Sequence, residues 1–477
     1  MLHHNFLFII RNFACMNKDT ICALATANGV GALGIIRVSG PDAIAVTNRC
    51  FKGKNLETAV SHTVHYGFIT DGDETIDEVM VSVFLAPKTF TTEDSTEISF
   101  HGSPHIAGKI LEVLTRNGAR MAKAGEFTMR AFMNGRIDLS QAEAIADIIA
   151  SENEASRKIA MNQLKGGITD EISVLRGDLL NFTSLVELEL DFAEEDVEFA
   201  DRTALNMLLN RIEEKLRSLV ESFRYGNAVK NGVEVAIIGK PNAGKSTLLN
   251  TLLKEERAIV SDIAGTTRDT IEEVLHIRGT AFRFIDTAGI RDTTDTIEAI
   301  GVQKAHEKIA AAKILLYLYD EFDSTPQEVA AFIKEVYRED LKVVLLHNKS
   351  DLSSEKGQNF DNDLRSALEA ENNVTLLSIS AREKVGIEEL KNELIDYVEG
   401  LKQSENNVII TNQRHHEALL RSLDSVRRVK DAVSQSFHTE LLAYELRYAL
   451  EYLGEISGEF TNDEVLGNIF SKFCIGK

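Results

Sequence analysis

Short β-type runs dominate the first quarter of the chain, and one helical pattern accompanies them. Between about residues 17 and 133, glycine turns separate apolar segments such as GALGIIRVSG, EVMVSVFLAPKTF and STEISFHGSP. The helical pattern follows in HIAGKILEVLTRNGA, where apolar residues recur at a spacing of three or four. We therefore expect a small α/β domain over residues 16–133.

Helical periodicity takes over at GRIDLSQAEAIADIIASENEASRKIAMNQLKGG, where Ser140 and Glu143 fit a capping box. It continues to about Arg224, and the acidic run ELDFAEEDVEF interrupts it. That run lacks the spacing of a calcium loop, so we expect a solvated connection between helices. Helical pattern returns from about Asn412 to Gly467. Strands and helices alternate between these two blocks, which predicts one helical domain with another domain inserted in it.

The predicted fold class is multidomain α/β plus all-α, with an N-terminal α/β domain, a helical domain built from two chain segments, and an inserted P-loop domain with a parallel-rich sheet. FLFII near the N-terminus is too short for a signal peptide, so we expect Met16 to be the working start. The predicted boundaries are 1–15 for an extension or mis-called start, 16–133 for the N-terminal domain, 134–229 and 401–477 for the helical domain, and 230–400 for the inserted domain.

Composition limits the classes of protein to which this chain can belong. The 477 residues are 44% apolar and 26% charged, which is enough to build buried cores. No apolar run approaches about 18 residues, so we expect no membrane-spanning helix. The four cysteines show neither paired spacing nor CxxC, which favours a reducing, cytoplasmic setting without a zinc site. A net charge of −22 argues against a chain that grips nucleic acid with its whole surface.

A glycine-rich loop joins an apolar strand to a helix in VEVAIIGKPNAGKSTLLNTLL. Gly239, Gly244, Lys245 and Ser246 satisfy G-x-x-x-x-G-K-[ST] in the strand–loop–helix context that the motif requires. The glycines let backbone N–H groups face phosphates at a helix N-terminus. Lys245 is expected to reach the β- and γ-phosphates and Ser246 to bind Mg²⁺.

Three later segments, FRFIDTAG, VVLLHNKSD and LLSISA, follow in the order of a GTPase. The Asp351 carboxylate can accept two N–H bonds from guanine, and adenine offers no matching pair of donors. Such a mismatch can discriminate by about 10⁴-fold. The predicted GTP-binding residues are Asn242, Ala243, Gly244, Lys245, Ser246, Thr247, Ser261, Thr266, Thr267, Asp286, Thr287, Ala288, Gly289, Asn348, Lys349, Asp351, Ser380 and Ala381.

The predicted switch region lacks two common devices. The residue after D-x-x-G is Ile290, which cannot orient water as the glutamine of Ras-like GTPases does, and no arginine finger is evident. SDIAGTTRD supplies Thr267 as a second Mg²⁺ ligand. A monovalent cation held by Asn242 and carbonyls of the 261–266 loop would sit where an arginine finger points. Asn242 could equally stabilise only the turn, and residue chemistry leaves both interpretations open.

The chain closely resembles the MnmE (TrmE) family of tRNA-modifying GTPases from Met16 to Lys477. The segments that carry the resemblance are GKPNAGKS, SDIAGTTRD, DTAGIRDTTDTIEAIG, GEFTMRAFMNGRIDLSQAEAIADII and GEFTNDEVLGNIFSKFCIGK. The resemblance implies a Ras-like, potassium-activated G domain that dimerises across the nucleotide. It implies Glu298 as the catalytic glutamate, whereas residue chemistry alone would favour an acid near a helix N-terminus. The implied potassium ligands are Asn242, Ser261, Ile263 and Thr266.

The resemblance also implies partners and a second site. Family members form homodimers and act with MnmG, a protein that uses FAD and NADH, in a heterotetramer or larger complex. Together they add an aminomethyl or carboxymethylaminomethyl group to C5 of the wobble uridine, position 34, of certain tRNAs. The carbon comes from 5,10-methylenetetrahydrofolate or 5-formyltetrahydrofolate on the N-terminal domain. The positions that match the family's folate site are Arg37, Glu97, Arg136 and Lys477, where Arg136 stands in place of the lysine of some relatives.

Cys474 lies four residues from the C-terminus, in CIGK. This tail is a poor prenylation box, because Gly476 is not aliphatic and Lys477 is not a usual final residue. Residue chemistry allows a small apolar residue that packs in a helical tail. The resemblance implies instead a functionally important cysteine near the folate region, with a catalytic role at the modification centre for which a thiolate is one candidate form.

Three other functions compete with a GTP-driven modification enzyme. A regulatory or ribosome-assembly GTPase explains the central domain but leaves Arg37, Glu97 and the tail without a role. A folate-dependent aminomethyltransferase-like enzyme would act without GTP. A membrane-anchored GTPase is disfavoured by the tail and the short N-terminal apolar run. We also expect the acidic chain to leave much of the tRNA grip to its partner.

Overall fold

The computed structural model describes residues 19–191, 202–256, 273–285, 309–352, 355–369, 371–402, 408–434, 439–461 and 463–476. Two compact units divide the chain. The first comprises Met1–Ile149, Gln163–Gly177 and Leu450–Lys477, and the second comprises Ala150–Asn162 and Asp178–Ala449. None of the described helices combines the length and apolar character needed to span a membrane.

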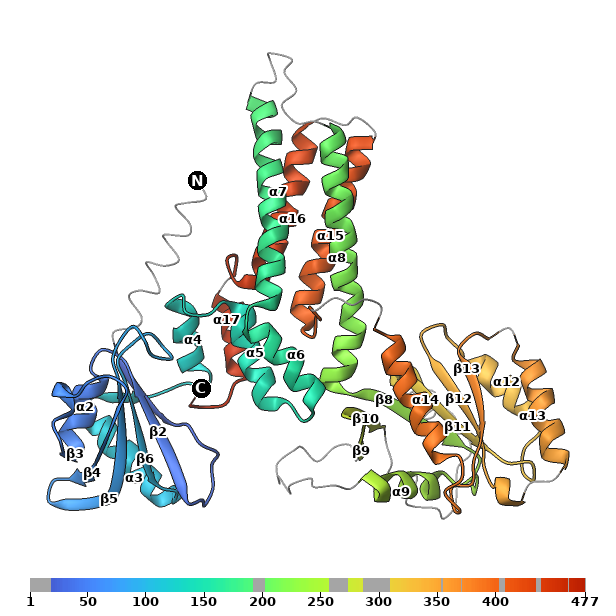
Figure 1. The fold of residues 1–477 in the computed structure, drawn as a ribbon, viewed down its shortest axis with the longest axis horizontal. Helices are drawn as coiled ribbons and strands as arrows, with labels where there is room; N and C mark the ends of the chain where they lie inside the picture. The colour runs from blue at the N-terminus through green and yellow to red at the C-terminus, as the bar shows by residue number, and fades with distance from the viewer. Residues whose placement is uncertain are drawn as a thin grey trace. The chain divides into compact units, whose positions relative to one another are not determined.

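The first unit contains a seven-stranded sheet in the order β3-β4-β5-β6-β2-β1-β7 (Figure 1). Apolar residues alternate along its strands and build a core with two of the helices. The strands are β1 (Thr20–Leu24), β2 (Leu33–Ser39), β3 (Phe51–Gly53), β4 (Thr63–Asp71), β5 (Glu74–Phe84), β6 (Ser95–His101) and β7 (Ala119–Met121). The helices of this region are α2 (Ala43–Cys50), the 3₁₀ turn η1 (Leu56–Thr58), α3 (Pro104–Arg116) and α4 (Glu126–Met133).

The helix content of this region differs from the expectation of a single helical pattern. The predicted helix is α3, and α2 and α4 are additional. Each of these two spans eight residues, about two turns, which is too short for periodicity to separate a helix from an irregular apolar run.

The capping of α5 (Leu139–Ala150) also differs from the prediction. Asp138 caps this helix: the Gln141 backbone N–H donates to Asp138 Oδ1 at 2.8 Å, and the Asp138 N–H donates to Gln141 Oε1 at 3.0 Å. Ser140 is buried in the first turn instead, and its hydroxyl donates to Asp138 Oδ1 at 2.8 Å. The expected Ser140–Glu143 box is therefore wrong, because an equally good Asp-x-x-Gln pair lies two residues earlier.

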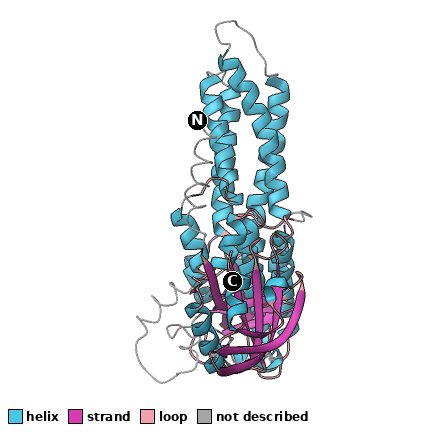
Figure 2. Ribbon diagram, turned by 90° about the vertical axis from the view of Figure 1, so that its left-hand side faces the viewer, coloured by secondary structure: helices cyan, strands magenta, loops and turns pink. Residues whose placement is uncertain are grey.

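Helices of the middle and C-terminal segments are α6 (Glu154–Leu164), α7 (Gly167–Asp191), α8 (Arg202–Asn231), α15 (Gln413–Ser434), α16 (Thr439–Ser457) and α17 (Asp463–Ser471). In the second unit, α8 lies beside α15 (Figure 1), and Arg211 of α8 pairs with Asp178 of α7. Figure 2 shows the long helices running alongside one another. The buried Glu213 of α8 pairs with Lys430, Arg427 and Arg217. These cations, Lys430 first, hold the pKa of Glu213 below its usual range.

The other half of the second unit is a six-stranded sheet in the order β13-β12-β11-β8-β10-β9, in which only β9 is antiparallel among the described strands. The strands are β8 (Val233–Gly239), β9 (Glu273–Ile277), β10 (Thr280–Phe284), β11 (Ile314–Tyr319), β12 (Lys342–His347) and β13 (Val374–Ser378). The helical elements are α9 (Lys245–Glu256), α12 (Pro326–Val336), the 3₁₀ turn η3 (Ser350–Leu352), α13 (Glu355–Ala367) and α14 (Ile387–Gly400).

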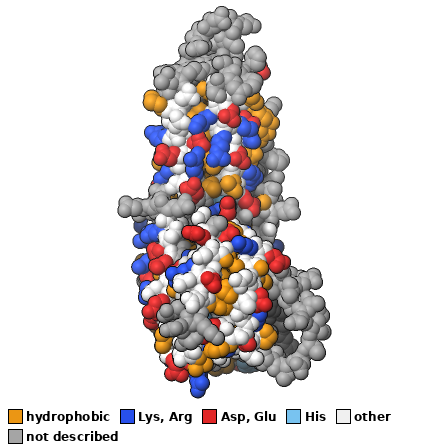
Figure 3. Space-filling view, turned by 90° about the vertical axis from the view of Figure 1, so that its right-hand side faces the viewer, with side chains coloured by type: hydrophobic (Ala, Val, Ile, Leu, Met, Phe, Trp, Pro, Cys, Tyr) orange, Lys and Arg blue, Asp and Glu red, His pale blue; other side chains and the backbone are white. Residues whose placement is uncertain are grey.

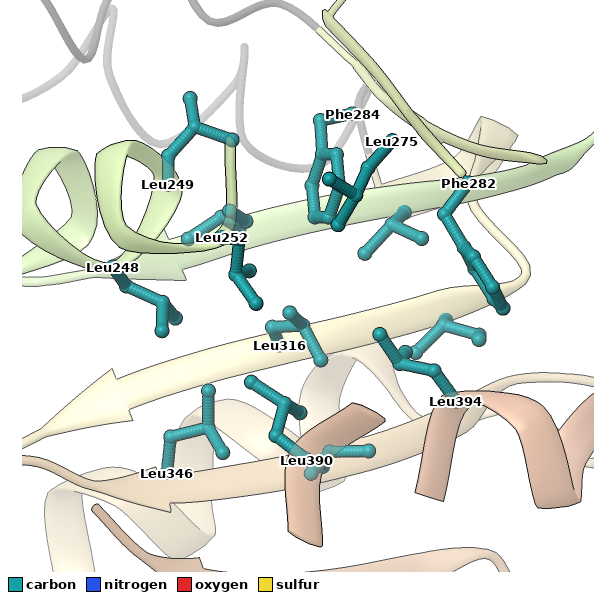
Figure 4. Packing of buried hydrophobic residues seen from close by; sticks show 14 of the residues in the cluster. Leu248, Leu249, Leu252, Leu275, Phe282, Phe284, Leu316, Leu346, Leu390 and Leu394 are labelled. Carbon is teal, nitrogen blue, oxygen red and sulfur yellow. The ribbon is translucent and has the colours of Figure 1, made fainter. Parts of the chain in front are cut away.

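Both faces of this sheet are covered, which explains why its central strands are continuous apolar runs. Alternate residues of β11 point to opposite faces, so Leu316 packs with α9 and α14 on one side (Figure 4). Leu315 packs with α12 and α13 on the other side. The carboxyl ends of β8, β11, β12 and β13 therefore meet at one edge, where ligands bind in open parallel sheets.

The predicted fold class is confirmed: a helical region built from two chain segments flanks an α/β domain with a parallel-rich sheet and helices on both faces, and a separate N-terminal α/β region precedes them. The acidic run ELDFAEEDVEF begins in α7, which ends at Asp191, and its remaining residues, 192–199, lie outside the described residues, as does the N-terminal extension. On the face drawn in Figure 3, acidic and basic side chains are interspersed.

Candidate functional site

The glycine-rich loop leaves β8 at Gly239 and enters α9 at Lys245. A Cβ on Gly239 would lie 2.4 Å from the Leu318 carbonyl oxygen, and one on Gly244 would lie 2.1 Å from Asn348 Nδ2. Gly244 and Asn242 also adopt left-handed backbone conformations, with φ of +99° and +63°. Close approach and backbone conformation thus both explain why glycine occupies position 244.

Asn348 ties this loop to the base-recognition segments. Its Nδ2 donates to the Ala243 carbonyl at 2.7 Å, and its Oδ1 accepts from the Ala381 backbone N–H at 3.0 Å. Thr251 of α9 donates to the Ala381 carbonyl at 2.9 Å and closes the connection. Asn348 is buried, so it acts as a brace between three segments that are far apart in the sequence.

Asp351 is held in place by Ser380, whose hydroxyl donates to Asp351 Oδ1 at 2.6 Å. The Ser380 hydroxyl in turn accepts from the Glu383 backbone N–H at 3.2 Å. The Asp351 side chain is exposed, and a carboxylate can accept up to about four hydrogen bonds. Asp351 therefore retains acceptor capacity for two N–H groups of a guanine base.

Two lysines complete the described part of this site. Lys349 places its Nζ 2.6 Å from Asp320 Oδ2. Burial alone would raise the pKa of Asp320, but Lys349 and the backbone N–H groups of Phe322 and Asp323 together hold that pKa below its usual range. Lys245 Nζ donates to the carbonyls of Gly239 at 2.6 Å and Lys240 at 2.8 Å, so the ammonium group lies over the loop.

A buried cluster behind the base-recognition loop was not anticipated from the sequence. His347 Nδ1 lies 3.0 Å from Asp361 Oδ1, and the Tyr319 hydroxyl donates to the same oxygen at 2.9 Å. The ring of Tyr319 stacks on His347 and Phe360 at 5.1 and 5.2 Å. Burial raises the pKa of Tyr319, which keeps its hydroxyl a donor. A histidine at the end of an apolar strand, directly before Asn348, was the available signal.

The remaining predicted residues of the nucleotide region lie outside the described part of the chain. They are Ser261, Ile263, Thr266, Thr267, Asp286, Thr287, Ala288, Gly289 and Glu298. Among the residues that are described, no group of three or more His, Cys, Asp or Glu side chains could hold a metal ion. Ser246 and Thr247 lie in the first turn of α9, a position from which a hydroxyl can reach a nucleotide-bound cation.

A second site is a cavity of about 560 Å³ in the N-terminal region. It brings together Arg37, Glu97 and Arg136, three residues that are far apart in the sequence. His62 and Thr92 also line it and have left-handed backbones, with φ of +64° and +62°. Strained residues of this kind concentrate at ligand sites. The rest of the lining is Phe84, Pro87, Lys88, Thr89, Phe90, Thr91, Ser95, Asn134 and Gly135.

Arg37 and Glu97 lie directly opposite each other on β2 and β6. Arg37 donates from Nε at 3.0 Å and from Nη2 at 2.8 Å to Glu97 Oε1. Its guanidinium also lies 5.5 Å from the ring centre of Phe90 and 5.7 Å from that of Phe127. Glu97 thus accepts both of these hydrogen bonds from the Arg37 guanidinium, and the two cation–π contacts fix the plane of the guanidinium.

A buried ionic cluster supports the wall of this cavity. Arg130 is fully buried and donates to both carboxylate oxygens of Glu93 at 3.2 Å. Glu93 accepts from Ser39 at 2.9 Å, and Ser39 shares a 2.6 Å hydrogen bond with Thr91 of the cavity wall. Asn134 donates to the Thr91 carbonyl at 2.6 Å. The helical segment EFTMRAFM gave no sign that its arginine would point inward.

The C-terminal tail runs along the N-terminal region. Ile475 forms an antiparallel bridge with Ala124, and the Gly125 N–H donates to the Cys474 carbonyl at 3.4 Å. Cys474 follows α17 and is exposed, so the alternative of a buried cysteine in a helical tail is wrong. Burial raises the pKa of Cys22 to about 11 and that of Cys50 to about 12, which keeps those two thiols protonated. Lys477 lies outside the described residues.

Comparison with known proteins identifies relatives over nearly the whole chain. The family described as MnmE helical domain matches residues 139–474, and the family described as GTP-binding protein TrmE N-terminus matches residues 20–136. The tRNA modification GTPase MnmE of Flavobacterium johnsoniae is 53% identical over 470 residues, covering 97% of this chain and 100% of the relative. The protein of the same name from Bacteroides thetaiotaomicron is 49% identical over 467 residues, covering 97% and 100%.

Proposed function

Because the chain belongs to the MnmE family of tRNA modification GTPases, we propose that it couples GTP hydrolysis in the central domain to tRNA chemistry at the N-terminal cavity. The chain is a GTP hydrolase that acts in tRNA modification. The main structural support for a nucleotide site is the buried side-chain amide of Asn348. It hydrogen-bonds to Ala243 of the phosphate loop and to Ala381 of the base loop.

At the nucleotide site, Asn348, Asp351, Ser380 and Ala381 bind the guanine, and Lys349 packs beside it. The loop from Asn242 to Thr247 binds the phosphates. Ser246 and Thr267 hold Mg²⁺, and Asn242, Ser261, Ile263 and Thr266 hold K⁺, a cation that supplies positive charge where an arginine finger is missing. Asp286 and Gly289 contact the metal sphere and the γ-phosphate, Thr287 and Ala288 belong to the same GTP-binding segment, and Glu298 positions the attacking water through a second water. Two such domains pair across the nucleotide, so the chain works as a homodimer.

At the N-terminal cavity, Arg37, Glu97 and Arg136 bind a tetrahydrofolate, with Lys477 contributing from the tail. The donor set suits this ligand: Glu97 is a carboxylate acceptor on the cavity wall, Phe90 offers a ring face, and Arg136 offers a guanidinium for a carboxylate. When bound, the folate supplies a one-carbon unit. The chain's own residues bind it, fix its orientation through Arg37 and Glu97, and place the Cys474 segment beside the same region.

The product is a C5-substituted wobble uridine, aminomethyl or carboxymethylaminomethyl, at position 34 of certain tRNAs. An MnmG-type protein that uses FAD and NADH is the partner, in a heterotetramer or larger complex in the cytoplasm. A chain with a net charge of −22 would leave much of the tRNA contact to this partner.

The test is nucleoside analysis of bulk tRNA from a strain that lacks this chain. The strain is complemented with the wild type, with Cys474→Ser, or with an empty vector. We expect modified wobble uridine to vanish with the empty vector and to return with the wild type. Unchanged nucleosides with the empty vector would overturn the modification function and favour the regulatory GTPase.

Cys474→Ser separates the role of the tail from that of the whole chain. Failure to restore the modified nucleoside, with normal folding and normal partner binding, would assign the thiol to the chemistry. Full restoration would show that the exposed thiol is dispensable. Replacement of potassium by sodium in a GTPase assay tests the cation, because equal turnover in sodium would contradict potassium activation.

A further inference from the structure

The charged groups of the N-terminal cavity are arranged unevenly between its wall and its mouth. Half-buried Arg37 and Glu97 form the wall together with buried Thr91 and Ser95. The other two charged lining residues, Lys88 and Arg136, are cationic and exposed. A ligand that enters this cavity therefore meets a neutralised ion pair inside and, at the mouth, two positive charges that no described acidic residue pairs with.

Lys88 and Arg136 differ from Arg37 in their partners. The Arg37 guanidinium forms an ion pair with the Glu97 carboxylate, with Nη2 and Oε1 2.8 Å apart. Arg136 lies 5.1 Å from the ring centre of Phe90, and neither it nor Lys88 forms an ion pair with any residue of the described ranges. In a chain with 74 acidic and 52 basic residues, two cations that pair with none of the described acidic residues therefore lie at one cavity mouth, where they can attract an anionic ligand.

We propose that this cavity selects folates that carry an extended γ-glutamyl tail, with the tail carboxylates leaving the cavity past Arg136 and Lys88. The proposal rests on the proposed folate function and adds the form of the ligand. Arg37 is then a positioning residue for the ring end through Glu97, and the carboxylate recognition belongs to the mouth.

The chemistry of the tail matches these two side chains. Each added γ-glutamyl unit brings one further carboxylate on a flexible chain, so successive carboxylates can reach cations that one carboxylate cannot reach together. Arg136 offers a planar fork to one carboxylate, and Lys88 offers a mobile point charge to the next. Because both cations are exposed, each pair adds a modest gain in affinity that salt screens.

The experiment measures the affinity of the full-length chain for 5-formyltetrahydrofolate in its monoglutamate and triglutamate forms by titration calorimetry. We expect the triglutamate to bind about three- to tenfold more tightly at low salt, as one or two exposed ion pairs would give. In Lys88→Gln the ratio of the two affinities should fall below about twofold, while monoglutamate binding stays close to that of the wild type. Raising the salt to about 0.5 M should reduce the wild-type ratio in the same way.

Lys52→Gln is the matched control, because Lys52 is an exposed lysine of β3 in the same region and does not line the cavity. It should keep the wild-type ratio. Equal affinity of the wild type for both folate forms would overturn the tail proposal and leave the folate site standing. Absence of binding by either form would instead overturn the folate function itself, so the two failures are distinguishable.

Discussion

The side-chain amide of Asn348 donates to the carbonyl oxygen of Ala243 at 2.7 Å and so links the end of β12 to the phosphate loop. The same side chain accepts from the Ala381 N–H, so one buried residue sets the distance between the phosphate-binding and base-binding segments. Because of these two hydrogen bonds, a displacement of the phosphate loop, of the end of β12 or of the base-binding segment would also displace the other two.

Asn348→Ala should weaken nucleotide binding strongly, because it leaves the Ala243 carbonyl and the Ala381 N–H without their partner. An orphaned buried group costs about 1–3 kcal/mol, so we expect the affinity for a fluorescent GDP analogue to fall about 10- to 100-fold. Asn359→Ala, an exposed asparagine on α13, is the control and should bind as the wild type does. A comparable loss in both variants would contradict the bracing role.

Gly244→Ala tests the close approach at the same point. The added Cβ would lie 2.1 Å from Asn348 Nδ2, on a backbone with φ of +99° that L side chains rarely adopt. We expect loss of measurable GDP binding, together with a lower unfolding midpoint in the absence of nucleotide. Gly400→Ala, on α14 with nothing within 4 Å of the new Cβ, should leave both quantities unchanged. GDP binding by Gly244→Ala at wild-type affinity would contradict the close approach of Asn348 to position 244.

Asp351→Asn should change the base that the site prefers. A carboxylate accepts from both the N1–H and the 2-amino group of guanine, whereas an amide can accept from N1–H and donate to the 2-carbonyl of xanthine. We expect GDP affinity to fall by about 100-fold or more and xanthosine diphosphate affinity to rise above it. Competition binding with the two nucleotides measures the ratio. Asp363→Asn on α13 should keep the guanine preference, and an unchanged preference in Asp351→Asn would remove Asp351 from base recognition.

Local pattern was enough to predict the strand, loop and helix over residues 233–256 and most of the fold. The apolar runs of β11 and β12 are continuous because helices cover both faces of their sheet, and the loops that follow carry recognisable motifs. The interactions that the sequence did not predict join residues distant in the chain. Arg37 meets Glu97 through the β2–β6 register, and His347 meets Asp361 through the packing of α13. Neither pairing leaves a periodic signal, because tertiary contact alone creates it.

His416 makes the helical region sensitive to acid. It stacks on Phe223 with ring centres 4.1 Å apart, and burial lowers its pKa despite the nearby Glu417. A histidine whose folded pKa lies below its unfolded value of about 6.5 contributes stability that is present above the unfolded value and is lost as pH falls from there through the folded pKa. We expect hydrogen-exchange protection factors in peptides of α15 to fall between pH 7.5 and 5.5.

His416→Gln removes the titrating ring while keeping a polar side chain of similar length. Its α15 protection should be lower than that of the wild type at pH 7.5 and should change less on acidification. Peptides of α3, in the N-terminal unit, report any general effect of acid on the chain. An equal pH dependence of α15 in the variant and the wild type would exclude His416 as the titrating group.

Gly476→Ala should detach the C-terminal tail from the N-terminal region. Gly476 has φ of +97°, and an added Cβ would lie 2.1 Å from the Leu24 carbonyl oxygen, so the chain cannot hold this path with a side chain present. We expect faster modification of the Cys474 thiol by a maleimide, measured in a Cys15→Ser background, because Cys22 and Cys50 are buried. Gly467→Ala on α17 meets nothing within 4 Å and should label at the wild-type rate. If the Gly476→Ala variant labels no faster than the wild type, the contact between Ile475 and Ala124 alone is sufficient to hold the tail.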